Sequence, residues 1–468
     1  MDNRTQRFDP NRTQLGVAPT AHDPLKTQAM AAFDPLKTMA MQAAVAFDGL
    51  KTEVIAGRTA TMANGPAREQ FLLELTAGAG SGAGAGAGSI PGAGVATGGR
   101  TPLNLCLVID RSGSMEGMPL EYVKQACSHV VDMLGPNDIL SIVTFEETVD
   151  VLMAPQRVTQ KQPIKEGIQR LMPGNTTNLY DGLALGAQQV LSVTDGGRAT
   201  RLVVLTDGDP TAGIKDFSAL VAHAADIKQR GISVTFLGFG PDYNEELLAS
   251  MAKRAGGNYY FIPRPEMIPE VFRVELDKLM TVAARNLQLS IKPARWVTMR
   301  GPQSAAENQE VTVPLADLER GATISQVFDF EFKNHPLGWY RVAAGKLSYD
   351  DLGGGGIRSV DIDFILEFTA DSARYSAPQD PRVAGAAQVA LASRVVEKTV
   401  MGLKTGAITQ MVAMEELQKT QMLLTQQGRA SEAQEVTMAL RALQSGDAGG
   451  AEKTLMGTML HLDQGKKS

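Results

Sequence analysis

Four segments between residues 102 and 285 are apolar on both faces, and this feature limits the possible folds more than any other. They have the sequences LNLCLVID (Leu103–Asp110), DILSIVTF (Asp138–Phe145), RLVVLTD (Arg201–Asp207) and ISVTFLGFG (Ile232–Gly240). Amphipathic stretches with helical spacing alternate with them, for example LEYVKQACSHVVDML and LYDGLALGAQQVL. Strands that are apolar on both faces are typical of parallel sheets covered by helices on both sides. The pattern therefore predicts an open, doubly wound α/β domain with a mostly parallel sheet over residues 101–285.

Alternating patterns typical of antiparallel strands flank this predicted α/β domain. Residues 286–376 contain NLQLSIKP, EVTVPL, ATISQVFDFEF, WYRVAAGKLSYDD and IRSVDIDFILEFTA, and residues 51–76 contain two further alternating stretches. Strands with one polar and one apolar face favour an antiparallel β-sandwich. The two early strands have no other partners close in sequence, so we expect them to complete the later sandwich. The α/β domain is then inserted into the β-sandwich.

The remaining regions after residue 76 are a linker and a helical tail. Residues 77–100 are rich in glycine and alanine, which cannot pack side chains and indicate a flexible linker. Residues 377–468 are rich in Ala, Gln, Met and Leu at helical spacing, with interruptions near Gly406, Gly428 and Gly446. This pattern predicts a helical hairpin or a small bundle at the C-terminus.

Residues 1–50 contain a degenerate repeat. Its copies are FDPNRT at Phe8, HDPLKT at His22, FDPLKT at Phe33 and FDGLKT at Phe47, and their starts are 14, 11 and 14 residues apart. One interpretation is a weakly ordered tail that arose by duplication. The other is a set of short docking motifs, each with an aromatic and a leucine around a charged turn, which gain avidity by repetition. The four readable copies favour docking.

Composition excludes several classes of protein. A net charge of −6 provides no basic field for nucleic acid. No run approaches the roughly 20 apolar residues that a membrane-spanning helix needs, and the N-terminus has no apolar region typical of a secretory signal. The two cysteines, Cys106 and Cys127, favour buried thiols in a reducing compartment. We therefore expect a cytoplasmic protein.

Three polar segments follow or flank the predicted strands at the carboxyl edge of the sheet, where open α/β domains bind ligands. They are DRSGS (Asp110–Ser114), PGNTTNLYDGL (Pro173–Leu183) and TDGD (Thr206–Asp209). Each alone is typical of a helix cap or a turn. Together they can bring at least two carboxylates and three hydroxyls into one crevice, with no cysteine or histidine in the three segments. This inventory suits one hard cation such as Mg²⁺ or Mn²⁺ better than zinc.

These three motifs carry a family resemblance. Asp-x-Ser-x-Ser after a buried strand, the threonine of TTNLYDGL and the aspartate of VVLTDGDPT resemble the metal-ion-dependent adhesion site (MIDAS) of von Willebrand factor A (VWA) domains. The resemblance covers residues 102–285. The wider arrangement of a β-sandwich and C-terminal helices around such a domain is similar to bacterial VWA proteins.

The resemblance implies a set of site residues and a cofactor. Ser112, Ser114 and Thr177 would bind the metal through their hydroxyls, and Asp110 and Asp207 directly or through water. Thr176 is the alternative to Thr177, because the two threonines are adjacent. The implied cofactor is Mg²⁺, with Mn²⁺ or Ca²⁺ as alternatives. No catalytic residue is expected.

The chemistry of such a site favours binding over catalysis. Two carboxylates neutralise a divalent ion and the hydroxyls add no charge, so the metal stays electrophilic. A partner protein can then present an Asp or Glu to it, which predicts a non-enzymatic, cation-dependent protein–protein interaction module. An alternative is self-assembly into a homo-oligomer through the N-terminal repeats or the helical tail. A metal-dependent hydrolase is a distant alternative, because no histidine lies in the motifs as a general base.

Overall fold

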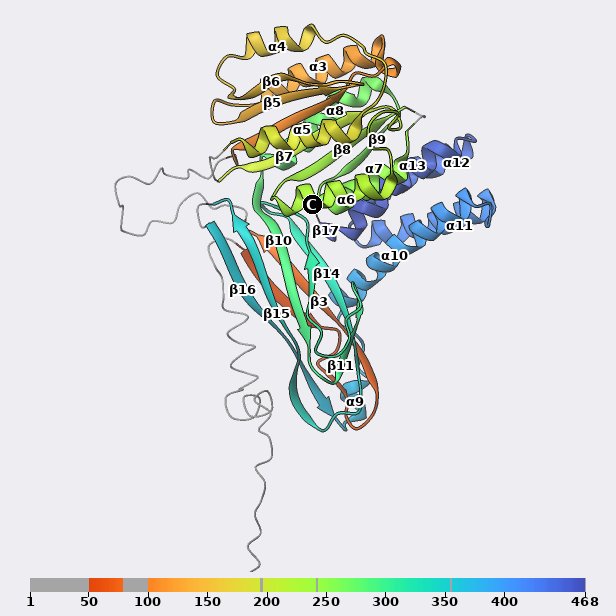
Figure 1. Cartoon of the computed structure of the whole chain (residues 1–468). Coiled ribbons are helices and arrows are strands. Elements are labelled where there is room, and N and C mark those ends of the chain that lie inside the picture. The colour runs from red at the N-terminus through yellow and green to blue at the C-terminus, as the bar shows by residue number, and fades with distance from the viewer. Residues whose placement is uncertain (1–49, 79–99, 194–196, 241–242, 354–355, 468) are drawn as a thin grey trace, which may run out of the picture.

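The protein consists of an α/β domain, a pair of mostly antiparallel sheets and a C-terminal group of helices (Figure 1). The computed structural model describes residues 50–78, 100–193, 197–240, 243–353 and 356–467. Residues 1–49 and nearly all of the Gly/Ala-rich linker lie outside these residues, so the predictions about them remain predictions. The last three residues of the fourth repeat, Leu50–Thr52, belong to β1.

The α/β domain contains a six-stranded sheet with the order β6-β5-β4-β7-β8-β9. Its strands are β4 (Leu103–Asp110), β5 (Ile139–Phe145), β6 (Val149–Arg157), β7 (Ala199–Thr206), β8 (Ser233–Phe239) and β9 (Tyr259–Ile262). All neighbouring pairs are parallel except β5 with β6. The predicted mostly parallel sheet is therefore confirmed. Strand β6 was not predicted, because its side chains are largely exposed and lack the apolar pattern.

Helices cover both faces of this sheet. One layer comprises α3 (Met118–Met133), α4 (Lys161–Gln169) and α8 (Ile268–Leu279), and the other comprises α5 (Leu179–Leu191), α6 (Phe217–Gln229) and α7 (Glu245–Ala255). Strand β4 shows why both layers are needed. Leu105 and Leu107 pack in the core with the first layer, whereas Cys106 and Val108 pack in the core with the second. Successive residues of a strand point to opposite faces, so a strand buried on both sides is apolar throughout.

Two further sheets lie below the α/β domain in Figure 1 and share an apolar core. The first contains β1 (Leu50–Ala56), β3 (Ala67–Ala77), β11 (Val297–Gly301), β14 (Thr323–Phe332) and β17 (Lys466–Lys467). The second contains β2 (Ala60–Met62), β10 (Val282–Pro293), β12 (Val311–Pro314), β13 (Leu318–Glu319), β15 (Gly338–Asp351) and β16 (Gly356–Thr369). Phe71 of β3 contacts Phe364 of β16 edge to face, with ring centroids 5.6 Å apart. We call these strands the two-sheet unit.

The two-sheet unit is built from both ends of the chain. Strand β3 pairs with β14 along ten residue pairs, from Ala67 opposite Phe332 to Thr76 opposite Thr323. Residues that precede the α/β domain therefore lie beside residues that follow it. The last strand, β17, also pairs with β14.

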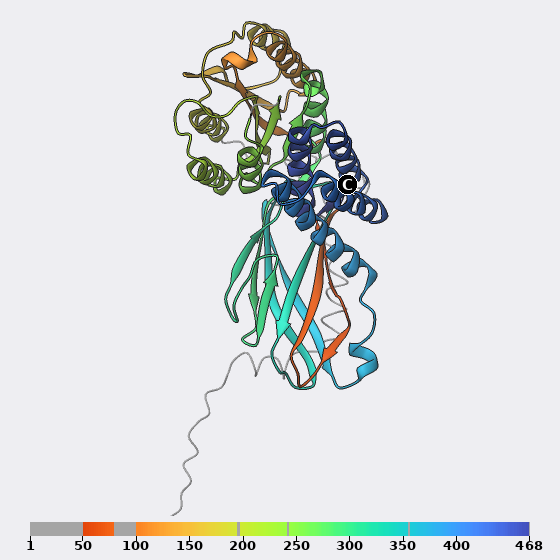
Figure 2. The ribbon, with the colours of Figure 1, turned by 90° about the vertical axis from the view of Figure 1, so that its right-hand side faces the viewer.

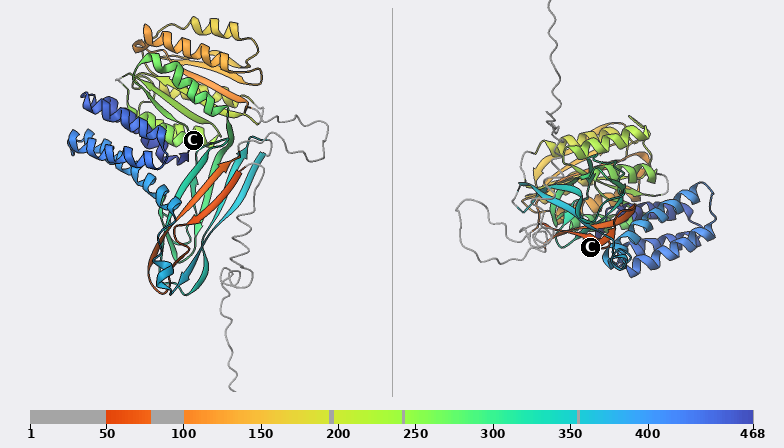
Figure 3. Two further views of the ribbon diagram at one scale, coloured as in Figure 1. Left: turned by 180° about the vertical axis from the view of Figure 1, so that it is seen from behind. Right: turned by 90° about the horizontal axis from the view of Figure 1, so that it is seen from below.

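The C-terminal region forms a bundle of four helices, α10 (Pro381–Lys404), α11 (Gln410–Gln426), α12 (Ala430–Gln444) and α13 (Ala448–Asp463), after the short helix α9 (Ser372–Tyr375). Gly406, Gly428 and Gly446 have φ of 68°, 71° and 83° and end the first three helices. The helices lie on one side of the molecule, where the α/β domain meets the two-sheet unit (Figures 2 and 3). Among the helices of the described ranges, none has the length and hydrophobicity needed to cross a membrane.

Lys453 fastens the bundle to the α/β domain. Its Nζ donates to the carbonyl oxygen of Tyr243 at 2.8 Å and to Glu245 at 2.9 Å, and it lies 4.1 Å from the centroid of the Tyr243 ring. Lys404, at the end of α10, pairs with Glu245 at 2.6 Å. Burial raises the pKa of Glu245, but hydrogen bonds from Lys404 and Lys453 outweigh it and lower that pKa to about 2. Two helices of the bundle are thus held at the first residue of α7.

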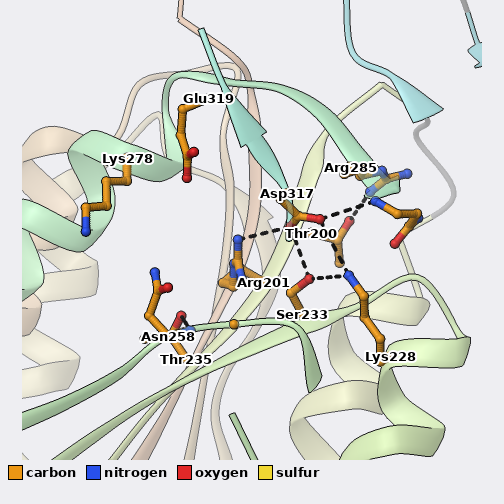
Figure 4. A network of polar contacts seen from close by, with 12 residues as sticks. Thr200, Arg201, Lys228, Ser233, Thr235, Asn258, Lys278, Arg285, Asp317 and Glu319 are labelled. Atoms are coloured by element: carbon orange, nitrogen blue, oxygen red, sulfur yellow. Dashed lines mark hydrogen bonds and ion pairs between the residues drawn. The ribbon is translucent and has the colours of Figure 1, made fainter. Parts of the chain in front are cut away.

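A buried network around Asp317 fastens the α/β domain to the two-sheet unit (Figure 4). The Asp317 carboxylate accepts hydrogen bonds from Arg201 at 3.1 Å, Ser233 at 3.1 Å and the backbone of Asn286 at 3.2 Å, and Lys228 lies 3.5 Å away. Burial raises the pKa of Asp317, but Lys228 and Arg201 hold it well below its ordinary range. Arg201 and Ser233 lie near the amino ends of β7 and β8. The two-sheet unit is therefore attached at the amino edge of the parallel sheet.

Candidate metal centre

The candidate site lies at the carboxyl edge of the parallel sheet. Strand β4 ends at Asp110, and the adjacent parallel strand β7 ends at Thr206, immediately before Asp207. Asp207 is six residues beyond Arg201, which corresponds to about 20 Å along a strand. The site consequently faces away from the Asp317 network and the two-sheet unit.

Asp110 is a fully buried carboxylate held in one orientation. One oxygen accepts a hydrogen bond from the backbone N–H of Ser112 at 2.8 Å, and the other accepts one from the Thr206 hydroxyl at 2.6 Å. Burial raises the pKa of Asp110 to about 7, and the nearby negative charge of Asp207 adds to the rise. Both effects disfavour the ionised carboxylate, and a cation beside it would reverse them.

A chain of hydrogen bonds links the two serines of the first motif to Asp207. The hydroxyls of Ser112 and Ser114 are 3.1 Å apart, and the Ser114 hydroxyl donates to Asp207 at 2.7 Å. Ser112 and Asp207 are buried, while Ser114 is exposed on the one-turn 3₁₀ helix η1 (Gly113–Met115). The two predicted carboxylates and both serines therefore meet at one place.

Thr177 comes to the same place from the loop before α5. Its backbone N–H donates to the Thr211 hydroxyl at 2.8 Å, and its carbonyl accepts from the N–H groups of Thr211 and Ala212 at 3.0 and 3.2 Å. A Cβ built on Gly208 would lie 3.7 Å from the Thr177 hydroxyl and 3.9 Å from the Ser114 hydroxyl. The hydroxyls of Thr177 and Ser114 are thus both close to Gly208, the residue that follows Asp207.

The neighbouring Thr176 has a different environment. Its hydroxyl is buried and has no hydrogen-bond partner in the described part of the chain. The distances from Gly208 show that the hydroxyl of Thr177, and not that of Thr176, lies near the hydroxyl of Ser114. Thr206 and Thr211 support the site but were not predicted as site residues. In the sequence, Thr206 is marked only by its position directly before Asp207, and Thr211 only by its position after the turn that follows Asp207.

We expect Thr177→Val to weaken Mg²⁺ binding about tenfold, because one oxygen ligand is lost while the side-chain shape is kept. Thr176→Val should leave Mg²⁺ binding within about twofold of the parent protein. Isothermal titration calorimetry of the parent and both variants measures this. A larger loss for Thr176→Val than for Thr177→Val would assign the ligand to Thr176.

The donor chemistry fits a hard cation. Within the described ranges there is no group of three or more His, Cys, Asp or Glu side chains that could hold a metal ion. A metal at this site must therefore rely on the serine and threonine hydroxyls together with the two carboxylates. Such an all-oxygen set suits Mg²⁺, Mn²⁺ or Ca²⁺, whereas zinc prefers nitrogen and sulfur ligands.

Sequence comparisons identify relatives of the α/β domain. Residues 104–273 match the family model of the von Willebrand factor type A domain. An uncharacterized protein of Synechocystis sp. is 32% identical over 224 residues, which cover 48% of this chain and 52% of that protein. Human inter-alpha-trypsin inhibitor heavy chain H2 is 27% identical over 199 residues, covering 40% of this chain and 21% of that protein. The chain thus spans about half or less of the length of these relatives.

Solved structures share the fold over more of the chain. A von Willebrand factor type A protein from Catenulispora acidiphila has a TM-score of 0.60 at 17% identity, covering 83% of this chain and 89% of that one. The ArnB paralog VWA2 from Sulfolobus acidocaldarius has a TM-score of 0.59 at 14% identity, covering 88% of this chain and 98% of that one. These likenesses show the fold. The family match, with the parallel sheet and its two helix layers, identifies residues 104–273 as a von Willebrand factor type A domain.

Proposed function

We propose that this protein is a non-enzymatic, divalent-cation-dependent protein–protein interaction module. Its MIDAS would consist of the side chains of Asp110, Ser112, Ser114, Thr177 and Asp207. When bound, Mg²⁺ would supply a positive centre that an Asp or Glu of a partner protein can ligate. Mn²⁺ and Ca²⁺ remain alternatives to Mg²⁺.

The observation that carries this proposal is the convergence of two carboxylates and three hydroxyls at an edge of the sheet. Asp110 is buried, and its pKa is raised to about 7 by burial, with a smaller contribution from Asp207. Ser114 is exposed while it donates to Asp207, so the site opens toward solvent on the side of Ser114. A carboxylate from outside can therefore approach a cation held there.

The rest of the chain supports a binding role. We interpret the two-sheet unit as a β-sandwich that holds the VWA domain as an insertion, and the Asp317 and Lys453 contacts as rigid attachments. The Asp317 attachment is at the amino edge of the sheet and leaves the carboxyl ends of β4 and β7 uncovered by the two-sheet unit. Cytoplasmic localisation is part of this proposal, and the buried thiols of Cys106 and Cys127 are consistent with it.

A pull-down from native lysate tests the proposal, with the parent protein and the Asp207→Asn variant, each in Mg²⁺ and in EDTA. We expect a partner band only for the parent protein in Mg²⁺, because the variant loses one of the two charges that hold the cation. Equal bands in all four lanes would move the binding surface away from the metal site. Metal-dependent hydrolysis of phosphoester or peptide substrates that is lost in the same variant would instead support the hydrolase alternative.

A further inference from the structure

Four large apolar side chains are exposed in the loops and at the helix starts around the candidate metal centre. Met118 is 61% exposed, Met172 69%, Ile214 44% and Phe217 40%. We call these four residues the apolar rim. Large apolar side chains that are exposed close to a binding centre favour contact with a partner molecule.

The apolar rim is positioned by the same loops that carry the site. Met118 begins α3, directly after the 3₁₀ turn that holds Ser114. The loop from Met172 to Thr177 is hydrogen-bonded to the first motif, since the N–H of Gly113 donates to the carbonyl of Asn175 at 3.3 Å. Ile214 and Phe217 follow Thr211 and Ala212, whose N–H groups bind the Thr177 carbonyl.

Two exposed carboxylates belong to the same surface. Glu116 is two residues after Ser114, and Asp209 is two residues after Asp207. A ligand for this surface should therefore combine one carboxylate for the cation, apolar groups for the rim, and a basic group for Glu116 or Asp209. Charge complementarity of this kind favours one orientation of the ligand.

The N-terminal repeats of the chain itself have this combination. In FDPLKT, Asp34 lies between Phe33 and Pro35, followed by Leu36 and Lys37. A residue before proline is restricted to extended conformations, so little entropy is lost when such a peptide binds in that form. In an extended peptide, alternate side chains point the same way, which directs the Asp and Leu to one surface.

The geometry points to the repeat segment of a second copy of this chain as the partner that the metal centre captures. This inference rests on the proposed function, because the repeat aspartate would ligate the MIDAS cation. The aspartates concerned are Asp9, Asp23 and Asp34. The leucine of the fourth copy, Leu50, is the first residue of β1 and is buried in the two-sheet unit. Three copies of the motif before β1 allow a chain to engage several others, with a gain in avidity.

The position of the segment favours capture between copies. Leu50, the first described residue, pairs with Ala77, whose N–H donates to Ala322 at the junction with the α/β domain. Asp48 is two residues before Leu50, a reach of about 7 Å. The metal centre lies at the opposite edge of the parallel sheet, about 20 Å away along the strands. Asp48 is therefore too close to Leu50 to reach the site of its own chain. Asp34 is 16 residues before Leu50, a reach of about 55 Å, so the dependence of mass on protein concentration is the measurement that separates capture between copies from capture within one chain.

A peptide-binding experiment tests the inference with the full chain. The receptor carries Asp→Asn at positions 9, 23, 34 and 48, so its own repeats cannot compete. The probe is a fluorescent peptide of residues 28–42, QAMAAFDPLKTMAMQ, and the matched control is the same peptide with Asp34→Asn. We expect the peptide to bind in Mg²⁺. The affinity should fall by about tenfold or more for the control peptide, and likewise for the original peptide in EDTA. Met172→Ser with Phe217→Ser in the receptor should weaken peptide binding but not Mg²⁺ binding.

The mass of the protein in solution provides the second measurement. By light scattering in Mg²⁺, the parent chain should form larger species as its concentration rises, and the four-Asn variant should stay monomeric. If calorimetry shows Mg²⁺ binding but both peptides bind equally or not at all, the inference is overturned and the proposed function stands. Peptide binding with a parent chain that stays monomeric at all concentrations overturns capture between copies. If Mg²⁺ does not bind, the proposed function fails, and the inference fails with it.

Discussion

In EDTA, the Asp110→Asn variant should be more stable than the parent protein, and in Mg²⁺ it should show no stabilisation by the metal. The first effect follows from burial of the carboxylate, which raises the pKa of Asp110 from 3.8 to about 7. Asparagine has the same shape and no charge. Its amide can accept from the Ser112 N–H and donate to the Thr206 hydroxyl, so both contacts of Asp110 are kept.

The pH dependence has a definite sign. Because the pKa of Asp110 is higher in the folded protein, the carboxyl weakens the fold as pH rises from about 4 to 7, and the cost is complete above pH 7. The full cost is on the order of 4 kcal/mol. The gain in melting temperature of the variant in EDTA should therefore be larger at pH 8 than at pH 5.

The effect of the metal has the opposite direction. Mg²⁺ at a hundred times its dissociation constant should stabilise the parent protein by about 2.7 kcal/mol, and the variant by nothing. Asp209→Asn is the matched control, because it removes an exposed carboxylate of the same loop and should alter neither result. A metal-dependent rise in the melting temperature of Asp110→Asn, equal to that of the parent, would contradict the assignment of Asp110.

The VWA domain and its candidate site were accessible to sequence reasoning because both depend on local patterns. Strand β4 is apolar at nearly every position since both faces are buried, and Asp110 follows at its end. Parallel strands bring their carboxyl ends to one edge, so the sequence alone predicts that Asp110 and Asp207 are neighbours. The structure places these two with Ser112, Ser114 and Thr177, while binding of a metal by these residues stays a prediction.

Other features depend on contacts between distant parts of the chain and leave no local signal. The edge strand β6 has five apolar residues among nine, but they do not alternate regularly with polar ones and most of its side chains are exposed. Asp317 lies in a short connection before β13, and its partner Arg201 is 116 residues away. The sequence pattern predicts Lys453 to be a surface residue of an amphipathic helix, yet it is buried against Tyr243. In each case the tertiary contact, and not the local pattern, determines the environment.

Asp317→Ala should be the most destabilising single substitution at the junction of the VWA domain and the two-sheet unit. It leaves Arg201, which is 5% exposed, and Lys228 without their shared carboxylate. Removing one partner of a buried ion pair costs about 3–5 kcal/mol, because the remaining charge is uncompensated. Glu331→Ala is the control, since its pair with Arg300 is solvent-exposed and should shift the urea midpoint little.

Tryptophan fluorescence can follow the unfolding of the two-sheet unit in this test. The two tryptophans of the chain, Trp296 and Trp339, both lie in the two-sheet unit, so their fluorescence reports on that unit, whereas far-ultraviolet circular dichroism is dominated by the helices of the other two parts. In the parent protein, we expect both signals to change at one urea concentration, because the Asp317 network couples the units. In Asp317→Ala the two transitions should separate, with the circular dichroism transition at lower urea. Coincident transitions in the variant at the parent midpoint would mean that the apolar contacts of the junction hold the units together without the ion pairs.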